Sequence, residues 1–178
     1  MVYKSGGFYS DLDSVTVKAL SPLKNVIGST TRDDTAAKHL ANGVFQLSKH
    51  HPVLKKLMEK MVTVYTGRSF NEIGPLLLTS TVMEQYNISD VENFKGGELE
   101  VLKPEVFFPA KSYELNKLWR QEPTSLSEWR SWLSQTSMVH FYSSQTNKLL
   151  VQRDGQHEAI AVLGPEYCPL SYQSSLWF

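Results

Sequence analysis

The sequence predicts an α/β fold in a single domain, because strand-like and helix-like segments alternate along the chain. Residues 14–19 include β-branched side chains and alternate polar with apolar ones, as in a strand with one buried face. Residues 52–65 repeat apolar side chains every three or four positions, as in an amphipathic helix. With 178 residues, of which 41% are hydrophobic, the chain is long enough to bury one core. We therefore assign residues 1–178 to one domain.

The helix at residues 52–65 is the clearest element of the sequence. Pro52 suits its first turn and Gly67 suits its end. The spacing predicts a buried face made of Leu54, Leu57, Met58, Met61, Val62 and Tyr65. It places on the opposite face Lys55, Lys56, Glu59 and Lys60.

Further elements follow from local signals. A second helix is predicted from Gly74 and Pro75 toward Gln85, and an S-x-x-E capping box predicts a short helix from residue 125 to residue 133. Alternation or buried β-branched runs predict strands at residues 43–47, 98–102 and 138–142. Gly6 and Gly7 predict a break or a close backbone approach before residue 8.

Composition argues against several classes of function. Lys+Arg and Asp+Glu both total 18, so the formal net charge is zero, which disfavours a nucleic-acid binder. A single cysteine, Cys168, excludes a disulfide within the chain. No apolar run is long enough to cross a bilayer, and the first residues lack a signal-peptide pattern.

Asp11 and Asp13 are the first candidates for chemistry. Two carboxylates at i and i+2 beside a strand end can reach one cation, and Mn²⁺ or Mg²⁺ prefers such oxygen ligands together with substrate phosphates. A polar turn between two strands gives the same spacing, and spacing alone favours that simpler interpretation. His140 has two interpretations as well: a metal or phosphate ligand, or a hydrogen-bonded histidine at the end of a buried strand.

Six segments, in order, resemble the α1,4-glycosyltransferases of the lactosylceramide galactosyltransferase type. Residues 3–13 are similar to the family's Y-G-G-I-Y-x-D-x-D segment, and residues 41–52 are similar to its N-G-x-F…H-x-F/L stretch. Gly74, Pro75 and Thr79 match G-P-x-x-x-T, and residues 102–109 resemble L-P-P-E-A-F-Y-P. Residues 138–142 with Thr146 resemble A-V-H-x-W and its downstream Ser, and residues 167–169 match Y-C-P. The likeness covers nearly the whole chain.

This resemblance implies a GT-A-like, Rossmann-like nucleotide-sugar transferase fold. It implies a retaining hexosyltransferase that moves galactose or N-acetylgalactosamine from UDP-galactose or UDP-N-acetylgalactosamine to a terminal sugar of a glycolipid, in α1,4 linkage. It further implies Mn²⁺ or Mg²⁺ as cofactor, and the lumenal side of the Golgi membrane as location. The metal ligands it implies are Asp11, Asp13 and His140. The donor-binding residues it implies are Asp11, Asp13, Asn42, Gly43, Gly74, Pro75, His140 and Thr146. No catalytic residue is assigned.

For several of these residues a purely structural role explains the sequence equally well. Gly74 and Pro75 also make a good helix start, Asn42 and Gly43 a turn, and Thr146 an ordinary loop.

Some positions depart from the family pattern. Glu72 adds a charge before the G-P segment, Ser80 stands where relatives usually have Arg, and Tyr142 stands where they have Trp. A divergent or inactive member, which binds a carbohydrate or a partner without turnover, is therefore the alternative. Family members are longer, with an N-terminal membrane anchor and an earlier nucleotide-binding segment. We therefore expect residues 1–178 to be the part of the fold from the Asp pair to the C-terminus, truncated at the N-terminus. In isolation we expect poor solubility and weak UDP binding.

Overall fold

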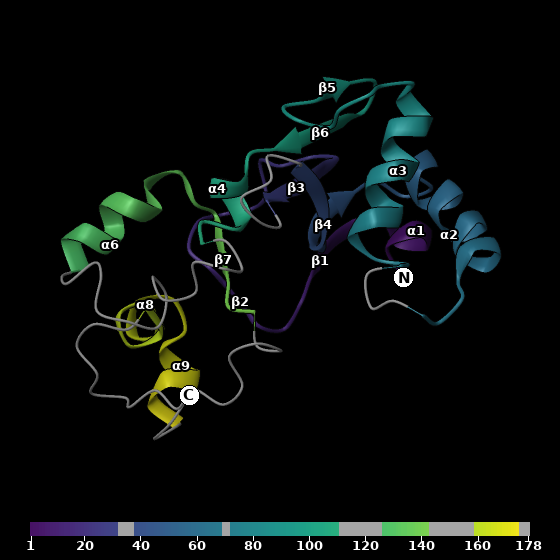
Figure 1. Ribbon diagram of the computed structural model, residues 1–178. Coiled ribbons are helices and arrows are strands. Elements are labelled where there is room, and N and C mark those ends of the chain that lie inside the picture. Colours follow the sequence, from purple (N-terminus) through teal and green to yellow (C-terminus); the bar gives the residue numbers. More distant parts are fainter. Residues whose placement is uncertain (32–37, 69–71, 111–125, 143–158, 175–178) are drawn as a thin grey trace. The chain divides into compact units, whose positions relative to one another are not determined.

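The computed structural model describes residues 1–31, 38–68, 72–110, 126–142 and 159–174 (Figure 1). Strands and helices both occur, and the larger sheet mixes parallel and antiparallel pairs, so the predicted α/β class is confirmed. The chain groups into two compact units. The first comprises Met1–Asp11 with Leu20–Pro104, and the second comprises Leu12–Ala19 with Glu105–Phe178. The assignment to a single domain stays a prediction, and each unit is described by itself.

The first unit is built on a five-stranded sheet of order β1-β4-β3-β6-β5. Only the β3–β6 pair is parallel among these strands; the other neighbours are antiparallel. The strands are β1 (Gly7–Ser10), β3 (Val26–Thr31), β4 (Lys38–Leu47), β5 (Lys95–Gly96) and β6 (Leu99–Leu102). The predicted strands at 43–47 and 98–102 are confirmed as parts of β4 and β6, whereas β1, β3 and β5 had not been predicted.

Three helices accompany this sheet: α1 (Val2–Ser5), α2 (Pro52–Val64) and α3 (Pro75–Tyr86). Figure 1 shows α2 and α3 side by side, and Leu54, Leu78 and Val82 from these two helices join the buried core of the sheet. The predicted break before residue 8 is also found. Gly6 has φ +70°, and a Cβ there would lie 2.7 Å from the Lys49 backbone nitrogen, so this position needs glycine.

The bounds of α2 were predicted well, but its buried face was not. Leu54 is buried and Leu57 packs against the core, whereas Met58, Val62 and Tyr65 are 42%, 86% and 61% exposed. The helix turns Lys56 and Lys60 toward α3, where both ammonium groups contact the Glu84 carboxylate, at 2.8 and 2.6 Å. These two ion pairs hold the pKa of Glu84 at about 2. The apolar stripe predicted from spacing is therefore wider than the surface that α3 and the sheet cover.

His51 caps the first turn of α2. Its Nδ1 accepts a hydrogen bond from the Val53 N–H at 3.3 Å, and the side chain is 1% exposed. Nε2 is buried without a hydrogen-bond partner among the described residues. Burial lowers the pKa of His51, and the Glu98 carboxylate opposes this shift only in part. The fold therefore holds this imidazole in its neutral form.

This burial predicts a loss of stability in mild acid. Because the folded pKa lies below the ordinary value of 6.5, the unfolded chain binds the proton first, so His51 disfavours folding progressively as pH falls below 6.5. The loss is at most about 1.4 kcal/mol for each pH unit. Urea unfolding at pH 7.5 and 5.5 measures it. His51→Asn keeps an N-cap acceptor and should remove this part of the pH dependence, whereas His50→Asn, at an exposed neighbour, should retain it. Equal slopes in both variants would contradict this assignment.

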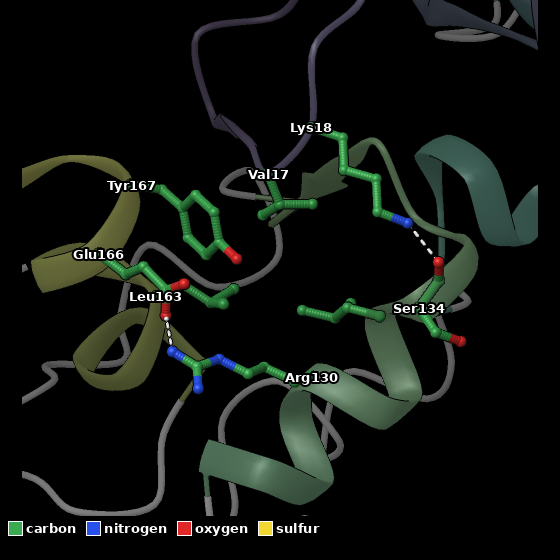
Figure 2. Close-up of a pocket in the computed structure, with 8 residues that line it drawn as sticks. Val17, Lys18, Arg130, Ser134, Leu163, Glu166 and Tyr167 are labelled. Carbon is green, nitrogen blue, oxygen red and sulfur yellow. Dashed lines mark hydrogen bonds and ion pairs between the residues drawn. The ribbon is translucent and has the colours of Figure 1, made fainter.

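The second unit contains an antiparallel two-stranded sheet, β2 (Ser14–Thr16) with β7 (Met138–His140). Its helical elements are α4 (Pro104–Phe107, whose first residue belongs to the first unit), α6 (Leu126–Trp132), the 3₁₀ turn η1 (Leu133–Gln135), α8 (Ala159–Tyr167) and α9 (Pro169–Ser174). Its core joins both strands with η1 and α8, through Val15, Ala110, Leu133, Val139, Phe141 and Leu163. A cavity of about 220 Å³ opens between the end of β2, α6 with η1, and α8 (Figure 2).

Both strands of this small sheet are shorter than predicted. The segment 14–19 pairs over three residues only, and the segment 138–142 leaves the ladder after His140. Tyr142 has φ +52°, a left-handed conformation that no strand continues. The predicted helix ending near residue 133 is confirmed as α6 with η1. No helix among the described residues is both long and apolar enough to cross a membrane.

Candidate functional site

Asp11 lies directly after β1, as the last residue of the first of the two segments that make up the first unit. Its backbone N–H donates to the Gly43 carbonyl at 2.8 Å, and its Oδ1 accepts a hydrogen bond from the Tyr9 hydroxyl at 2.7 Å. Leu12, the next residue, is fully exposed, while Asp11 and Asp13 are half-buried. The chain therefore exposes Leu12 and leaves the two aspartates on either side of it partly buried.

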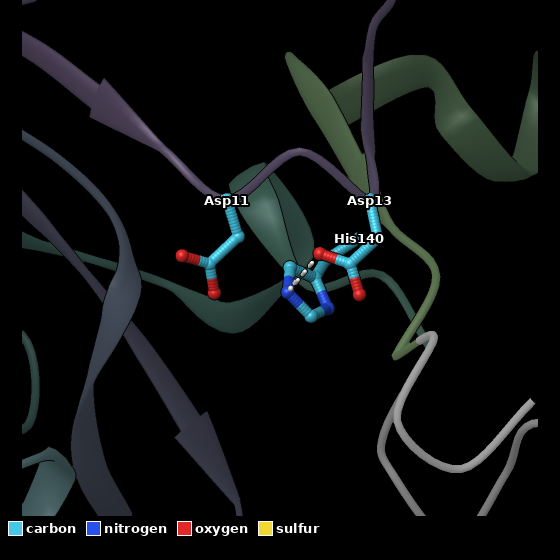
Figure 3. Close-up of side chains that lie close together, drawn as sticks. All are labelled: Asp11, Asp13 and His140. Atoms are coloured by element: carbon cyan, nitrogen blue, oxygen red, sulfur yellow. Dashed lines mark ion pairs between the residues drawn. The ribbon is translucent and has the colours of Figure 1, made fainter. Parts of the chain in front are cut away.

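Asp13 and His140 contact each other within the second unit. The His140 Nε2 lies 3.3 Å from the Asp13 Oδ1, and the two side chains are 10% and 20% exposed (Figure 3). The β2–β7 pairing creates this contact: Ser14 lies opposite His140, and the Phe141 N–H donates to the Asp13 carbonyl at 2.8 Å. Residues far apart in sequence thus meet at one end of a three-residue ladder.

The ring of His140 is oriented by its surroundings. Its Nδ1 accepts a hydrogen bond from the Tyr142 N–H at 3.2 Å, and the Phe108 and Tyr142 rings lie 5.5 and 4.6 Å away, centroid to centroid. When Nδ1 accepts, the proton of the neutral ring is on Nε2, toward Asp13. An ion held by Nε2 requires that proton on Nδ1, so ion binding and the Tyr142 contact exclude each other.

The side chains present fit a divalent cation. Asp11 and Asp13 are two residues apart, so their Cα atoms lie within about 7 Å of each other whatever the arrangement of the units. With His140 they form, among the described residues, a group of the composition that holds a metal ion. Two carboxylates and one imidazole are ligands that Mn²⁺ accepts, and Mg²⁺ accepts the carboxylates.

Most of the donor-binding residues predicted in the first unit are brought together. Gly43 binds Asp11 through its carbonyl, and Asn42, its exposed neighbour on β4, lies beside Gly74, where an added Cβ would be 3.5 Å from the Asn42 Oδ1. Gly74 is the N-cap of α3, Pro75 is its first residue, and no side chain among the described residues caps that end of the helix. Within the described part of the chain, the backbone N–H groups of the first turn therefore have no side-chain cap.

Thr79 holds α3 against β4. Its hydroxyl donates to the Pro75 carbonyl at 2.7 Å and accepts from the Leu40 N–H at 2.9 Å, and the residue is 7% exposed. Leu40 stands two residues before Asn42 on β4. The threonine of the G-P-x-x-x-T motif therefore has a structural role, which fixes Gly74 beside Asn42.

Two further side chains adjoin the candidate ligands, Tyr9 beside Asp11 and Ser14 beside His140; Tyr9 stands in the segment similar to Y-G-G-I-Y-x-D-x-D, although it was not predicted as a site residue. Tyr9 donates to Asp11, and the Ser14 Oγ is buried without a partner among the described residues. Ser14 and His140 are direct cross-strand partners, so their side chains lie on the same face of the ladder. The period of two along a strand would have placed Tyr9 beside Asp11, but the partner of Ser14 depends on a long-range pairing.

Of the other residues singled out from the sequence, Thr146 falls outside the described residues. Glu72 accepts hydrogen bonds from the Thr66 hydroxyl at 2.6 Å and from the Gly67 N–H at 3.0 Å, and these bonds lower its pKa. The charge that departs from the family pattern therefore closes the turn after α2.

Comparison with known proteins places these residues in context. The family model described as alpha 1,4-glycosyltransferase conserved region matches residues 46–175. Asp11, Asp13, Asn42 and Gly43 precede that region. No solved structure matches the chain.

The matches to individual proteins extend further toward the N-terminus. Lactosylceramide 4-alpha-galactosyltransferase of Homo sapiens is 26% identical over 176 residues, which cover 98% of this chain and 47% of that protein. The Mus musculus protein of the same name is 26% identical over 98% of this chain and 46% of its own length. The chain thus spans about half the length of these two relatives, and 77% of the Pongo pygmaeus protein of that name.

Proposed function

Because the chain belongs to the α1,4-glycosyltransferase family, we propose that it is a metal-dependent, retaining hexosyltransferase. Its donor is UDP-galactose or UDP-N-acetylgalactosamine, and its acceptor is the terminal sugar of a glycolipid, which receives an α1,4 linkage. The observation that carries this proposal is the contact of Asp13 with His140. Together with Asp11, two residues before Asp13, these side chains could hold one divalent cation. The names of the relatives support a glycolipid acceptor.

The acidic residues and His140 hold the cofactor in this proposal. Mn²⁺ or Mg²⁺, when bound, neutralises the diphosphate and makes UDP a better leaving group. Asp11 and Asp13 supply the carboxylate ligands, and His140 supplies Nε2 after its contact with Tyr142 opens. Tyr9 keeps Asp11 in place by its hydrogen bond, and the Phe108 ring packs against the His140 ring at a tilt.

The first unit contributes the donor sugar site in this proposal. The uncapped start of α3 offers backbone N–H groups to sugar hydroxyl or phosphate oxygens, beside the exposed Asn42 amide. Gly43 and Pro75 shape the backbone on either side, and Thr146 is proposed to bind a phosphate oxygen. A location on the lumenal side of the Golgi membrane belongs to the same proposal.

A transfer assay tests this function. UDP-galactose and UDP-N-acetylgalactosamine are offered separately with a lactose-terminated glycolipid, with Mn²⁺ or with EDTA, and the product is analysed by NMR. We expect one donor to give a new α1,4-linked sugar only when the metal is present. Absence of transfer from either donor, together with UDP binding that ignores the metal, would instead support a non-catalytic carbohydrate- or partner-binding member.

A further inference from the structure

The cavity of the second unit has an apolar floor. Val17, Leu133 and Leu163 line it, and the last two are 6% and 2% exposed. Figure 2 shows the Tyr167 ring lying over Leu163 and facing the space between β2 and η1. The burial of its phenol, together with the neighbouring Glu166 carboxylate, raises the pKa of Tyr167, so the neutral hydroxyl is able both to donate and to accept hydrogen bonds.

The rim of this cavity is charged but internally paired. The Arg130 Nη2 lies 3.1 Å from the Glu166 Oε2, which joins α6 to α8 across the opening (Figure 2). On the other side the Lys18 ammonium donates to the Ser134 carbonyl. The guanidinium group of Arg130 carries five N–H donors, and the ion pair with Glu166 is made through Nη2. The rim therefore offers charged donors and an acceptor at fixed positions, and both of its cations already have an oxygen partner.

Size and chemistry together select the kind of ligand. A volume of about 220 Å³ is below the roughly 300–1,000 Å³ of pockets for drug-sized molecules, so the cavity suits a single ring rather than a nucleotide or an acyl chain. A phosphate group is disfavoured because each cation of the rim already has an oxygen partner. A sugar ring has an apolar C–H face for Tyr167 and the leucines, and hydroxyl groups for Arg130 and Glu166.

We propose that this cavity binds one neutral sugar ring of the acceptor glycan, an inference that rests on the proposed function. The cavity is separate from Asp13, the proposed metal ligand of the same unit. Asp13 directly precedes β2 and Val17 directly follows it, four residues later, which corresponds to about 13 Å of extended chain. A ring in the cavity is therefore a different ring from the one transferred, and it contributes to the choice of acceptor.

Binding of free sugars to the whole chain tests this site. Methyl β-D-galactopyranoside and lactose are titrated without metal and followed by saturation-transfer NMR, with an expected dissociation constant of about 1 mM for a ligand of this size. Glu166→Gln and Tyr167→Ala should each weaken binding about tenfold. Glu105→Gln makes the same charge change at an exposed residue of the same unit, outside the cavity lining, and should leave binding unchanged. Tyr167→Phe, which keeps the aromatic ring, serves as a second variant if Tyr167→Ala fails to fold. Its sugar affinity should fall by no more than about threefold.

The same samples separate this proposal from the proposed function. Sugar binding that weakens in the cavity variants while Mn²⁺-dependent UDP binding stays unchanged supports both. Sugar binding that is absent from the wild-type chain, or equal in wild type and cavity variants, overturns the cavity proposal alone. Cavity-dependent sugar binding without any metal-dependent UDP binding would retain the cavity as a glycan site and overturn the transferase function.

Discussion

Asp13→Ala is expected to abolish the Mn²⁺-dependent part of UDP binding, with a loss of affinity of about a hundredfold or more. The substitution removes a half-buried carboxylate that lies 3.3 Å from the His140 Nε2, and with it a metal ligand and the group that orients the imidazole. Calorimetry with UDP, in the presence of Mn²⁺ and again with EDTA, measures the metal-dependent and the metal-independent parts of the affinity.

Two comparisons make this result specific. Asp13→Asn keeps the shape of the side chain but not its charge, and its affinity for UDP in the presence of Mn²⁺ should be close to that of Asp13→Ala. Asp90→Ala removes an exposed carboxylate from the loop after α3 and should bind UDP as the wild type does. If Asp13→Ala keeps its metal-dependent affinity, or if EDTA leaves wild-type binding unaltered, the carboxylate pair does not hold the donor.

Ile27→Ala is expected to lower the free energy of unfolding by about 2–5 kcal/mol. Ile27 is fully buried on β3, paired with Phe45 of β4 on one side and Val101 of β6 on the other. The truncated side chain leaves a cavity at the centre of the sheet, where both neighbouring strands restrict collapse. Because domains are stable by only about 5–15 kcal/mol, such a loss removes a large part of the total. Urea unfolding followed by circular dichroism measures it.

The control for this variant comes from α2. Val62→Ala should change the free energy of unfolding by less than about 0.5 kcal/mol, because Val62 is 86% exposed. Ile27→Val should lie between the two, at about 0.5–1.5 kcal/mol. If Val62→Ala lowered the free energy of unfolding as much as Ile27→Ala does, Val62 would be buried, as the spacing of α2 predicted.

The elements that the sequence predicted are those with local causes. Pro52 at the first turn and Pro75 after Gly74 begin α2 and α3, and both helices end within a residue of their predicted limits. The carboxylates of Asp11 and Asp13 were found by spacing and motif order, because they are neighbours along the chain. Their role as metal ligands, like the roles of Asn42, Gly43 and Gly74, stays a prediction.

Tertiary contacts decided which apolar residues are buried. The helical period predicts one wide apolar face on α2, but only its Leu54 and Leu57 part packs against the core. Lys56 and Lys60, on the face predicted to be opposite, reach Glu84 on α3. The strand β3 was missed because Gly28, Ser29 and Thr30 give it little apolar alternation. Its place between β4 and β6 comes from pairings with distant segments.

The sequence by itself determined the α/β class, the principal helices and the pair of aspartates, because turns, caps and short-range periodicity depend on neighbouring residues. Only the tertiary structure set the His140 imidazole beside Asp13 and Tyr167 over Leu163. Both depend on elements distant in the chain: the β2–β7 ladder brings His140 to Asp13, and the cavity gathers η1 and α8 at the end of β2. Contacts of that kind are selected by the burial of whole faces, which no local pattern encodes.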